Sequence, residues 1–199
     1  MEGFEADRYL VDQLLRPIVN LYRVSPLGPG ETPLGPPVAY VRQKKMAIKE
    51  DIRFYADEGE TQELYRIKAR SVFDIGGAKY EVFAGEQKIG QLEHQFRASL
   101  IRSTWRVLGA DDAELMIARE RSLPMAIARR VIDFVPYGGW IPIPYNFEFL
   151  IDGRVAGGMQ RKFQLRDRYI LDLSGDHDRR IDRRLAIALA IGLDTLQNR

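Results

Sequence analysis

The run Leu185-Ala186-Ile187-Ala188-Leu189-Ala190-Ile191-Gly192-Leu193 decides the fold class of this 199-residue chain. It lies in a proline-free segment over residues 178–197, for which we predict a helix that is apolar on every side. A helix without a polar face must be surrounded by the rest of the protein. At 1.5 Å per residue the run spans about 14 Å, which suits a protein interior and is too short for a bilayer.

The sequence before this helix predicts short β-strands separated by turn residues. In Tyr65-Arg66-Ile67-Lys68-Ala69-Arg70 apolar and basic residues alternate, so the three basic side chains are expected to face outward. Further strands are expected at residues 18–24, 38–45, 52–57, 79–84, 89–96, 104–108, 115–121, 147–151, 155–163 and 169–173. Strands at this spacing predict a sandwich or a barrel, and the enclosed helix favours a barrel closed around it.

Three segments interrupt the strand pattern. Apolar residues at roughly helical spacing predict an N-terminal helix over residues 1–16, and a second helix is expected over 125–134. Residues 25–37 contain five prolines and three glycines and are expected to form a loop. Asp176 or Asp178 is expected to cap the C-terminal helix, with Asp182 in its first turn. The length suits a single domain over residues 1–199.

Residues 80–108 and 147–173 contain a weak internal repeat. In each, an aromatic–Glu strand is followed by a tight turn, a basic residue, a glycine-containing strand and an aromatic strand. Two related three-stranded units explain this order, and the alternative is the ordinary regularity of any β-meander.

Composition excludes several function classes. The chain has no cysteine and two histidines, which excludes disulfides, thiolate metal sites and a thiol nucleophile and leaves little for histidine-rich metal chemistry. Net charge is +2 from 30 basic and 28 acidic residues, which does not indicate nucleic-acid binding. The first residues lack the basic start and apolar run of a signal peptide, so we expect a cytoplasmic protein. No cofactor is predicted.

Several strings, in the order in which they occur, resemble the tubby C-terminal-like superfamily, and within it the LURP-one-related and phospholipid-scramblase-like proteins. They are Arg42-Gln43-Lys44, Lys49-Glu50, Arg70-Ser71-Val72-Phe73-Asp74, Tyr80-Glu81-Val82, Ser103-Thr104-Trp105, Arg168-Tyr169-Ile170-Leu171-Asp172 and the closing run from Asp182 to Asp194. The resemblance covers roughly residues 17–197. It implies a mainly β fold, a closed twelve-stranded antiparallel barrel around a central hydrophobic C-terminal helix.

The resemblance also implies a ligand class, because tubby-type members bind phosphoinositides through a basic face. The candidate headgroup residues here are Arg42, Lys44, Lys45, Arg129, Arg130, Arg161 and Lys162. The expected partner is then an anionic phospholipid or a membrane surface, to which the protein would bind peripherally. The alternative interpretation is a solvated barrel exterior on which acids such as Glu50, Glu120 and Asp133 are interspersed.

Scramblase-type members carry an acidic calcium-binding segment just before the C-terminal helix. Asp172, Asp176, Asp178 and Asp182 occupy that position here, but Arg179 and Arg180 follow immediately and would oppose a dication. We therefore interpret the segment as a polar turn that caps the helix, with Asp176, Asp178 and Asp182 as weak calcium candidates, and predict no metal. The chain also lacks the acylated cysteine cluster and the long proline-rich N-terminal region of scramblases.

The sequence gives little support for catalysis. Ser174 and His177 lie near Asp176 and Asp178, but this cluster more simply ends a strand and begins a helix. We therefore predict a non-enzymatic, membrane-surface binding barrel. Two alternatives stay open: a soluble protein-interaction module that uses loop 25–37, and a small-molecule carrier or enzyme with a pocket beside the core helix.

Overall fold

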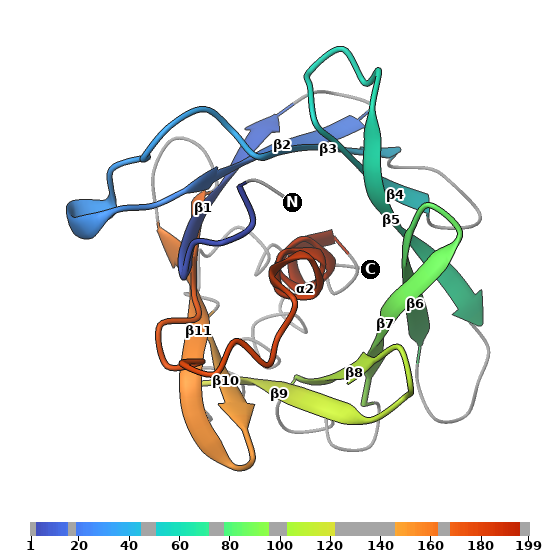
Figure 1. Ribbon diagram of the computed structural model, residues 1–199, viewed down its shortest axis with the longest axis vertical. Coiled ribbons are helices and arrows are strands. Elements are labelled where there is room, and N and C mark those ends of the chain that lie inside the picture. Colours follow the sequence, from blue (N-terminus) through green and yellow to red (C-terminus); the bar gives the residue numbers. More distant parts are fainter. Residues whose placement is uncertain are drawn as a thin grey trace, which may run out of the picture.

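A closed antiparallel barrel encloses a single helix along its axis (Figure 1). The computed structural model describes residues 3–15, 19–44, 51–71, 78–95, 103–121, 146–162 and 168–195. Within them the strands are β1 (Arg8–Leu15), β2 (Val19–Pro26), β3 (Ala39–Lys44), β4 (Asp51–Tyr55), β5 (Glu63–Ser71), β6 (Lys79–Ala84), β7 (Gln87–His94), β8 (Thr104–Gly109), β9 (Glu114–Glu120), β10 (Asn146–Ile151), β11 (Arg154–Lys162) and β12 (Arg168–Asp172). Each strand pairs with its neighbours in sequence and β1 pairs with β12, which confirms the predicted fold class.

Alternation of side chains along the strands separates the core from the surface. On β5, Tyr65 and Ile67 are fully buried, whereas Lys68 and Arg70 are exposed. Arg66 also lies on the outer face, where it pairs with Glu63 and Glu86 at 3.3 and 2.9 Å. The predicted register of this strand is confirmed.

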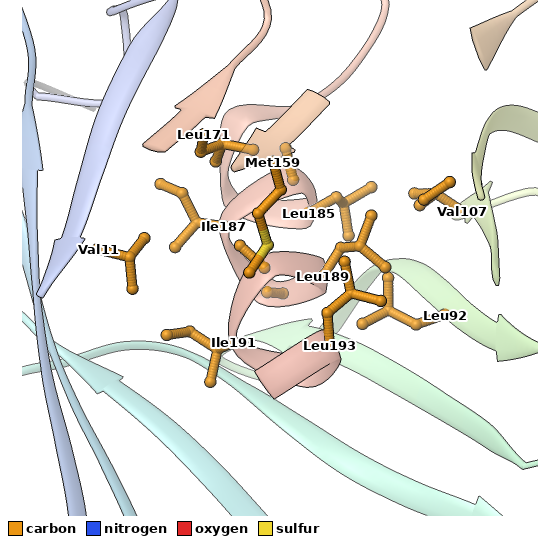
Figure 2. Packing of buried hydrophobic residues seen from close by; sticks show 14 of the residues in the cluster. Val11, Leu92, Val107, Met159, Leu171, Leu185, Ile187, Leu189, Ile191 and Leu193 are labelled. Atoms are coloured by element: carbon orange, nitrogen blue, oxygen red, sulfur yellow. The ribbon is translucent and has the colours of Figure 1, made fainter. Parts of the chain in front are cut away.

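The helix α2 (Arg183–Thr195) fills the barrel. Every residue from Leu185 to Ile191 is at most 1% exposed, and Leu193 is fully buried. In Figure 2, Ile187 and Ile191 point toward Val11 of β1, while Leu189 and Leu193 point toward Leu92 of β7. Apolar side chains therefore cover the helix all round, which is why it needs no polar face.

The structure corrects the prediction of an N-terminal helix. Residues 8–15 form β1, on which Tyr9, Val11 and Gln13 face inward with at most 7% exposure. A period of two fits these residues, and the strand supplies the hydrogen-bonding partner that closes β2 against β12. The helix predicted at residues 125–134 lies outside the described residues.

The start of the C-terminal helix also differs from prediction. The helix begins at Arg183 and not at residue 178. Its cap is Asp182, whose Oδ1 accepts the backbone N–H of Arg184 at 2.9 Å. The segment before it is held in turns by Asp176. Loop 25–37 is close to prediction, since residues 27–38 join β2 to β3 and contain one short 3-10 turn, η1 (Pro29–Glu31).

The two segments of the predicted internal repeat share features of strand pairing. The β6–β7 ladder shifts register between Val82 and Phe83, and the β10–β11 ladder shifts at the equivalent place, between Phe149 and Leu150. A Cβ on Gly90 would lie 2.5 Å from the carbonyl oxygen of Leu108, and one on Gly157 would lie 2.0 Å from that of Asp172. Register shifts also occur in the β4–β5, β5–β6 and β8–β9 ladders, so this feature does not separate a duplicated unit from the regularity of a β-meander.

Candidate functional site

The described members of the predicted headgroup set lie on two separate strands. Arg42 and Lys44 belong to β3, whereas Arg161 and Lys162 end β11, and three strands stand between these two. At about 4.8 Å per strand they are about 19 Å apart along the wall. Lys45, Arg129 and Arg130 lie outside the described residues.

Two of these cations have acidic partners on the barrel surface. Arg42 Nη1 lies 2.8 Å from Glu60 Oε1, and Lys162 Nζ lies 2.8 Å from Glu31 Oε1. Side chains in both pairs are between 30% and 45% exposed. Exposed pairs of this kind contribute little free energy, so the cations are available to exchange partners.

The calcium candidates occupy the turn where β12 passes into α2, and the carboxylate oxygens of Asp176 and Asp182 already have partners. Asp176 Oδ1 accepts the N–H of Arg180 at 2.9 Å, and Oδ2 accepts that of Ile181 at 3.1 Å. Asp182 caps α2, and Asp178 is exposed. Within the described residues, no group of three acidic or histidine side chains is arranged to hold a metal ion.

The strongest polar contact of this turn is the buried pair of Asp176 and Arg183. Arg183 Nη1 lies 2.6 Å from Asp176 Oδ2, and the two side chains are 3% and 1% exposed. Arg183 Nη2 reaches Asp7 at 2.9 Å, which ties the N-terminal segment to the helix. Burial raises the pKa of Asp176, but Arg183 and the two backbone N–H groups outweigh it and hold that pKa below its usual value.

A second polar cluster, which the sequence did not reveal, fixes the other end of α2. The hydroxyl of Tyr22 donates to Asp194 Oδ2 at 2.6 Å, and that of Tyr169 donates to Oδ1. Gln13 in turn donates to the Tyr22 hydroxyl at 3.3 Å. The one available signal was an acid in the last turn of an otherwise apolar helix. Both ends of α2 are therefore anchored to the barrel wall by carboxylates.

The connections at one end of the barrel are strongly acidic. At the end where β12 enters α2, here called the helix-entry end, every connection from residue 3 onward is described. These segments are residues 3–7, 27–38, 56–62, 85–86, 110–113, 152–153 and 173–182. They contain thirteen acidic residues and two basic ones, a net charge of −11. Because the whole chain carries +2, the remainder carries +13.

Three hollows lined by described residues lie on the outside of the barrel. The first, of about 490 Å³, crosses β10, β11 and β12 and has Gly157 and Gly158 in its floor. A second, of about 480 Å³, adjoins it at Val155 and faces the turn that contains Asp176. A third, of about 430 Å³, lies beside loop 27–38. Ligands that use these hollows would bind to the outer wall or rim.

Comparison with known proteins identifies the family. Residues 38–194 match the family model described as LURP-one-related, and that family belongs to the tubby-like superfamily. A search of curated proteins finds no match. None of the helices in the described part of the chain has the length and hydropathy to cross a bilayer. The match extends over more than three quarters of the sequence and agrees with the barrel and its central helix, and the chain belongs to the LURP-one-related family.

Proposed function

We propose that this protein is a non-enzymatic barrel that binds anionic membrane surfaces with the part of the molecule that faces away from the helix-entry end. The observation that supports this is the division of charge, −11 in the connections at one end against +13 in the rest of the chain. Such a distribution orients a protein in the field of an anionic bilayer, with the acidic end turned away. The candidate contacts are the predicted headgroup residues other than Arg42 and Lys162, whose acidic partners Glu60 and Glu31 belong to the helix-entry connections.

Among the described groups, the resolved pKa shifts of carboxyl and tyrosine side chains lead away from neutral pH. A hydroxyl hydrogen bond lowers the pKa of Asp57, and hydrogen-bonded cations lower those of Asp112 and Asp152. Burial raises the pKa of Tyr9 to about 12 and lifts that of Tyr65 well above its usual value. General acid–base catalysis near neutral pH needs shifts in the opposite directions.

Ser174 and Asp176, two members of the cluster considered above for catalysis, are hydrogen-bonded to residues outside a catalytic triad. The Ser174 hydroxyl donates to Asp172 Oδ1 at 2.6 Å, and Asp176 is engaged by Arg183. A carrier with a pocket beside the core helix also lacks support, because α2 is packed against the wall and the hollows described above open outward.

Co-sedimentation with vesicles tests the proposal. We expect the full chain to bind vesicles containing phosphatidylserine or a phosphoinositide and not to bind neutral phosphatidylcholine vesicles. The bound protein should dissociate from the anionic vesicles as the salt concentration rises. Neutralising a pair of headgroup candidates, as in Lys44→Gln with Lys45→Gln, should weaken binding about 30-fold, since each cation near an anionic surface contributes about 1 kcal/mol.

The matched control is Arg179→Gln with Arg180→Gln, which removes the same charge from the helix-entry end. It should leave vesicle binding within about twofold or strengthen it. Equal partitioning into neutral and anionic vesicles, or equal loss in both double variants, would contradict the proposal.

A further inference from the structure

The hollow beside loop 27–38 is an apolar groove at the helix-entry end. It is bordered by the N-terminal segment, that loop and the β4–β5 turn, and its volume of about 430 Å³ is in the range of ligand clefts. All of its lining residues are apolar side chains, prolines or glycines, among them Phe4, Leu34, Val38 and Leu64. The groove therefore offers apolar contact and no side-chain hydrogen bond.

Leu34 stands at this groove in an exposed and fixed position. Its side chain is 67% exposed, which is exceptional for a large apolar residue in the described part of the chain. The loop beneath it is held by the N–H of Leu34 donating to the carbonyl of Pro26 at 2.9 Å, and by a β-bridge between Leu27 and Pro33. An apolar side chain presented on a rigid loop loses little conformational entropy when a partner covers it.

The segments that line the groove contain acidic residues and no lysine or arginine, and cations of neighbouring elements pair with several of these acids. Residues 3–7, 27–38 and 56–64, which contribute its lining, contain seven acidic residues. Glu58 and Glu60 reach back to Arg23 and Arg42 on the outer wall, in pairs that are at least 30% exposed on each side. Exposed pairs of this kind are weak, so a cation from a partner can replace the internal one.

We propose that this groove docks a segment of a partner protein in which lysine or arginine residues flank two or more apolar side chains, and that Leu34 lies at the centre of the interface. The apolar lining of the groove accepts the apolar side chains of the segment, and the acidic residues of the segments that line it attract the lysine or arginine residues on either side. An acidic segment is repelled by these acidic residues, and so is an anionic bilayer. The site is therefore separate from the membrane contact proposed above.

Selection from a random library of displayed 12-residue peptides, with the full chain immobilised, tests this inference. The enriched peptides should carry an excess of lysine or arginine around apolar residues. Labelled copies of the best peptides should bind in fluorescence anisotropy, and their affinity should fall as salt rises from 50 to 300 mM. Enrichment of acidic or uncharged peptides, or no enrichment, would overturn the proposal.

Two variants locate the binding. Leu34→Asp should weaken binding of the selected peptides at least tenfold, because it replaces the central apolar contact with a carboxylate that the peptide's apolar side chains would have to desolvate. Val155→Asp is the matched control, since Val155 is 63% exposed and lies at the two other hollows. It should change affinity less than twofold, and thermal melts should show both variants folded. Equal losses in the two variants would place the peptides elsewhere and refute the assignment.

Discussion

The side chains of Arg183 and Asp176 are almost completely buried, and they illustrate how single residues hold this barrel together. Their pair joins the β12–α2 turn to the helix, and Asp7 extends it to the N-terminal segment. A buried ion pair contributes little beyond a well-packed apolar pair, but removing one member leaves an uncompensated charge. Its role is to position the start of α2.

Arg183→Met should therefore lower the free energy of unfolding by about 3–5 kcal/mol. Adding Asp176→Asn should recover part of that loss, since it removes the unpaired buried charge and keeps an oxygen acceptor for the backbone N–H groups of the turn. The matched control is Arg23→Met, which breaks the exposed pair with Glu58 and should cost at most about 1 kcal/mol. Urea unfolding of the three variants measures these differences, and a double variant less stable than Arg183→Met would contradict the interpretation.

The same pair predicts a dependence of stability on pH. Because the pKa of Asp176 is lowered in the folded state, its contribution is complete above the unfolded value of about 3.9 and is lost as pH falls through the folded pKa. Asp176→Asn should remove this part of the acid sensitivity. The free energy of unfolding, measured by urea titration from pH 6 to pH 2, should fall less steeply in the variant than in the parent protein. Parallel curves would show that Asp176 does not contribute.

At the scale of elements, the packing between helix and strands depends on side-chain size. Leu189 is fully buried and faces Leu92 across the gap between α2 and β7 (Figure 2). Leu189→Ala should cost about 2–5 kcal/mol through lost transfer free energy and a cavity. Val155→Ala, at an exposed strand position, should change stability by less than about 0.5 kcal/mol. Thermal and urea unfolding compare the two, and similar losses would mean that α2 is not part of the core.

At Gly90, where β7 contacts the helix, there is no room for a side chain. A Cβ on Gly90 would lie 2.5 Å from the carbonyl oxygen of Leu108 and 2.7 Å from Leu185 Cδ1. Gly90→Ala should therefore destabilise the protein by about 1–3 kcal/mol through overpacking. Gly35→Ala is the control, because a Cβ there meets nothing within 4 Å, and its melting temperature should stay within a degree or two of the parent. A harmless Gly90→Ala would show that the strand and helix can separate at no cost.

Some strands and the central helix could be predicted from the sequence, and β1 could not. Strands with clean alternation, such as β5, and the apolar helix were predictable because one period fits each of them. β1 was not, since its apolar residues fit a helical period as well as the strand period, and only the pairing with β12 decides between them. The role of Asp194 could not be predicted either, because its hydrogen-bond partners Tyr22 and Tyr169 are distant in sequence and contact it only in the folded barrel.

On the scale of the whole molecule, the strand topology determines at which end of the barrel the charged residues of each connection lie. Successive connections of an up-and-down barrel alternate between its two ends, so residues that are interleaved along the chain are sorted into two surfaces. A balanced composition of 30 basic and 28 acidic residues conceals this division. The acidic end is visible only after the connections are assigned to ends, which the sequence alone does not do.

Removing the central helix tests the whole architecture. A chain that lacks residues 183–199 should fail to fold, because the inward side chains of twelve strands would enclose an empty apolar centre. We expect no cooperative melt by far-ultraviolet circular dichroism. A cooperative transition near that of the full chain would refute the view that α2 is the core of the barrel.

The position of α2 after all twelve strands also affects how the protein is made. From Arg8 to Arg183 the ribosome adds 175 residues, which takes about 9–35 s at about 5–20 residues per second. Throughout that time the emerging strands have apolar inner faces and no helix to close around, and until Asp172 has been added β1 also lacks its complete partner β12. The nascent chain therefore spends tens of seconds as a set of incomplete sheets, a state prone to aggregation. Molecular chaperones that shield apolar segments during translation should accordingly raise the yield of this protein more than that of a helical protein of the same length.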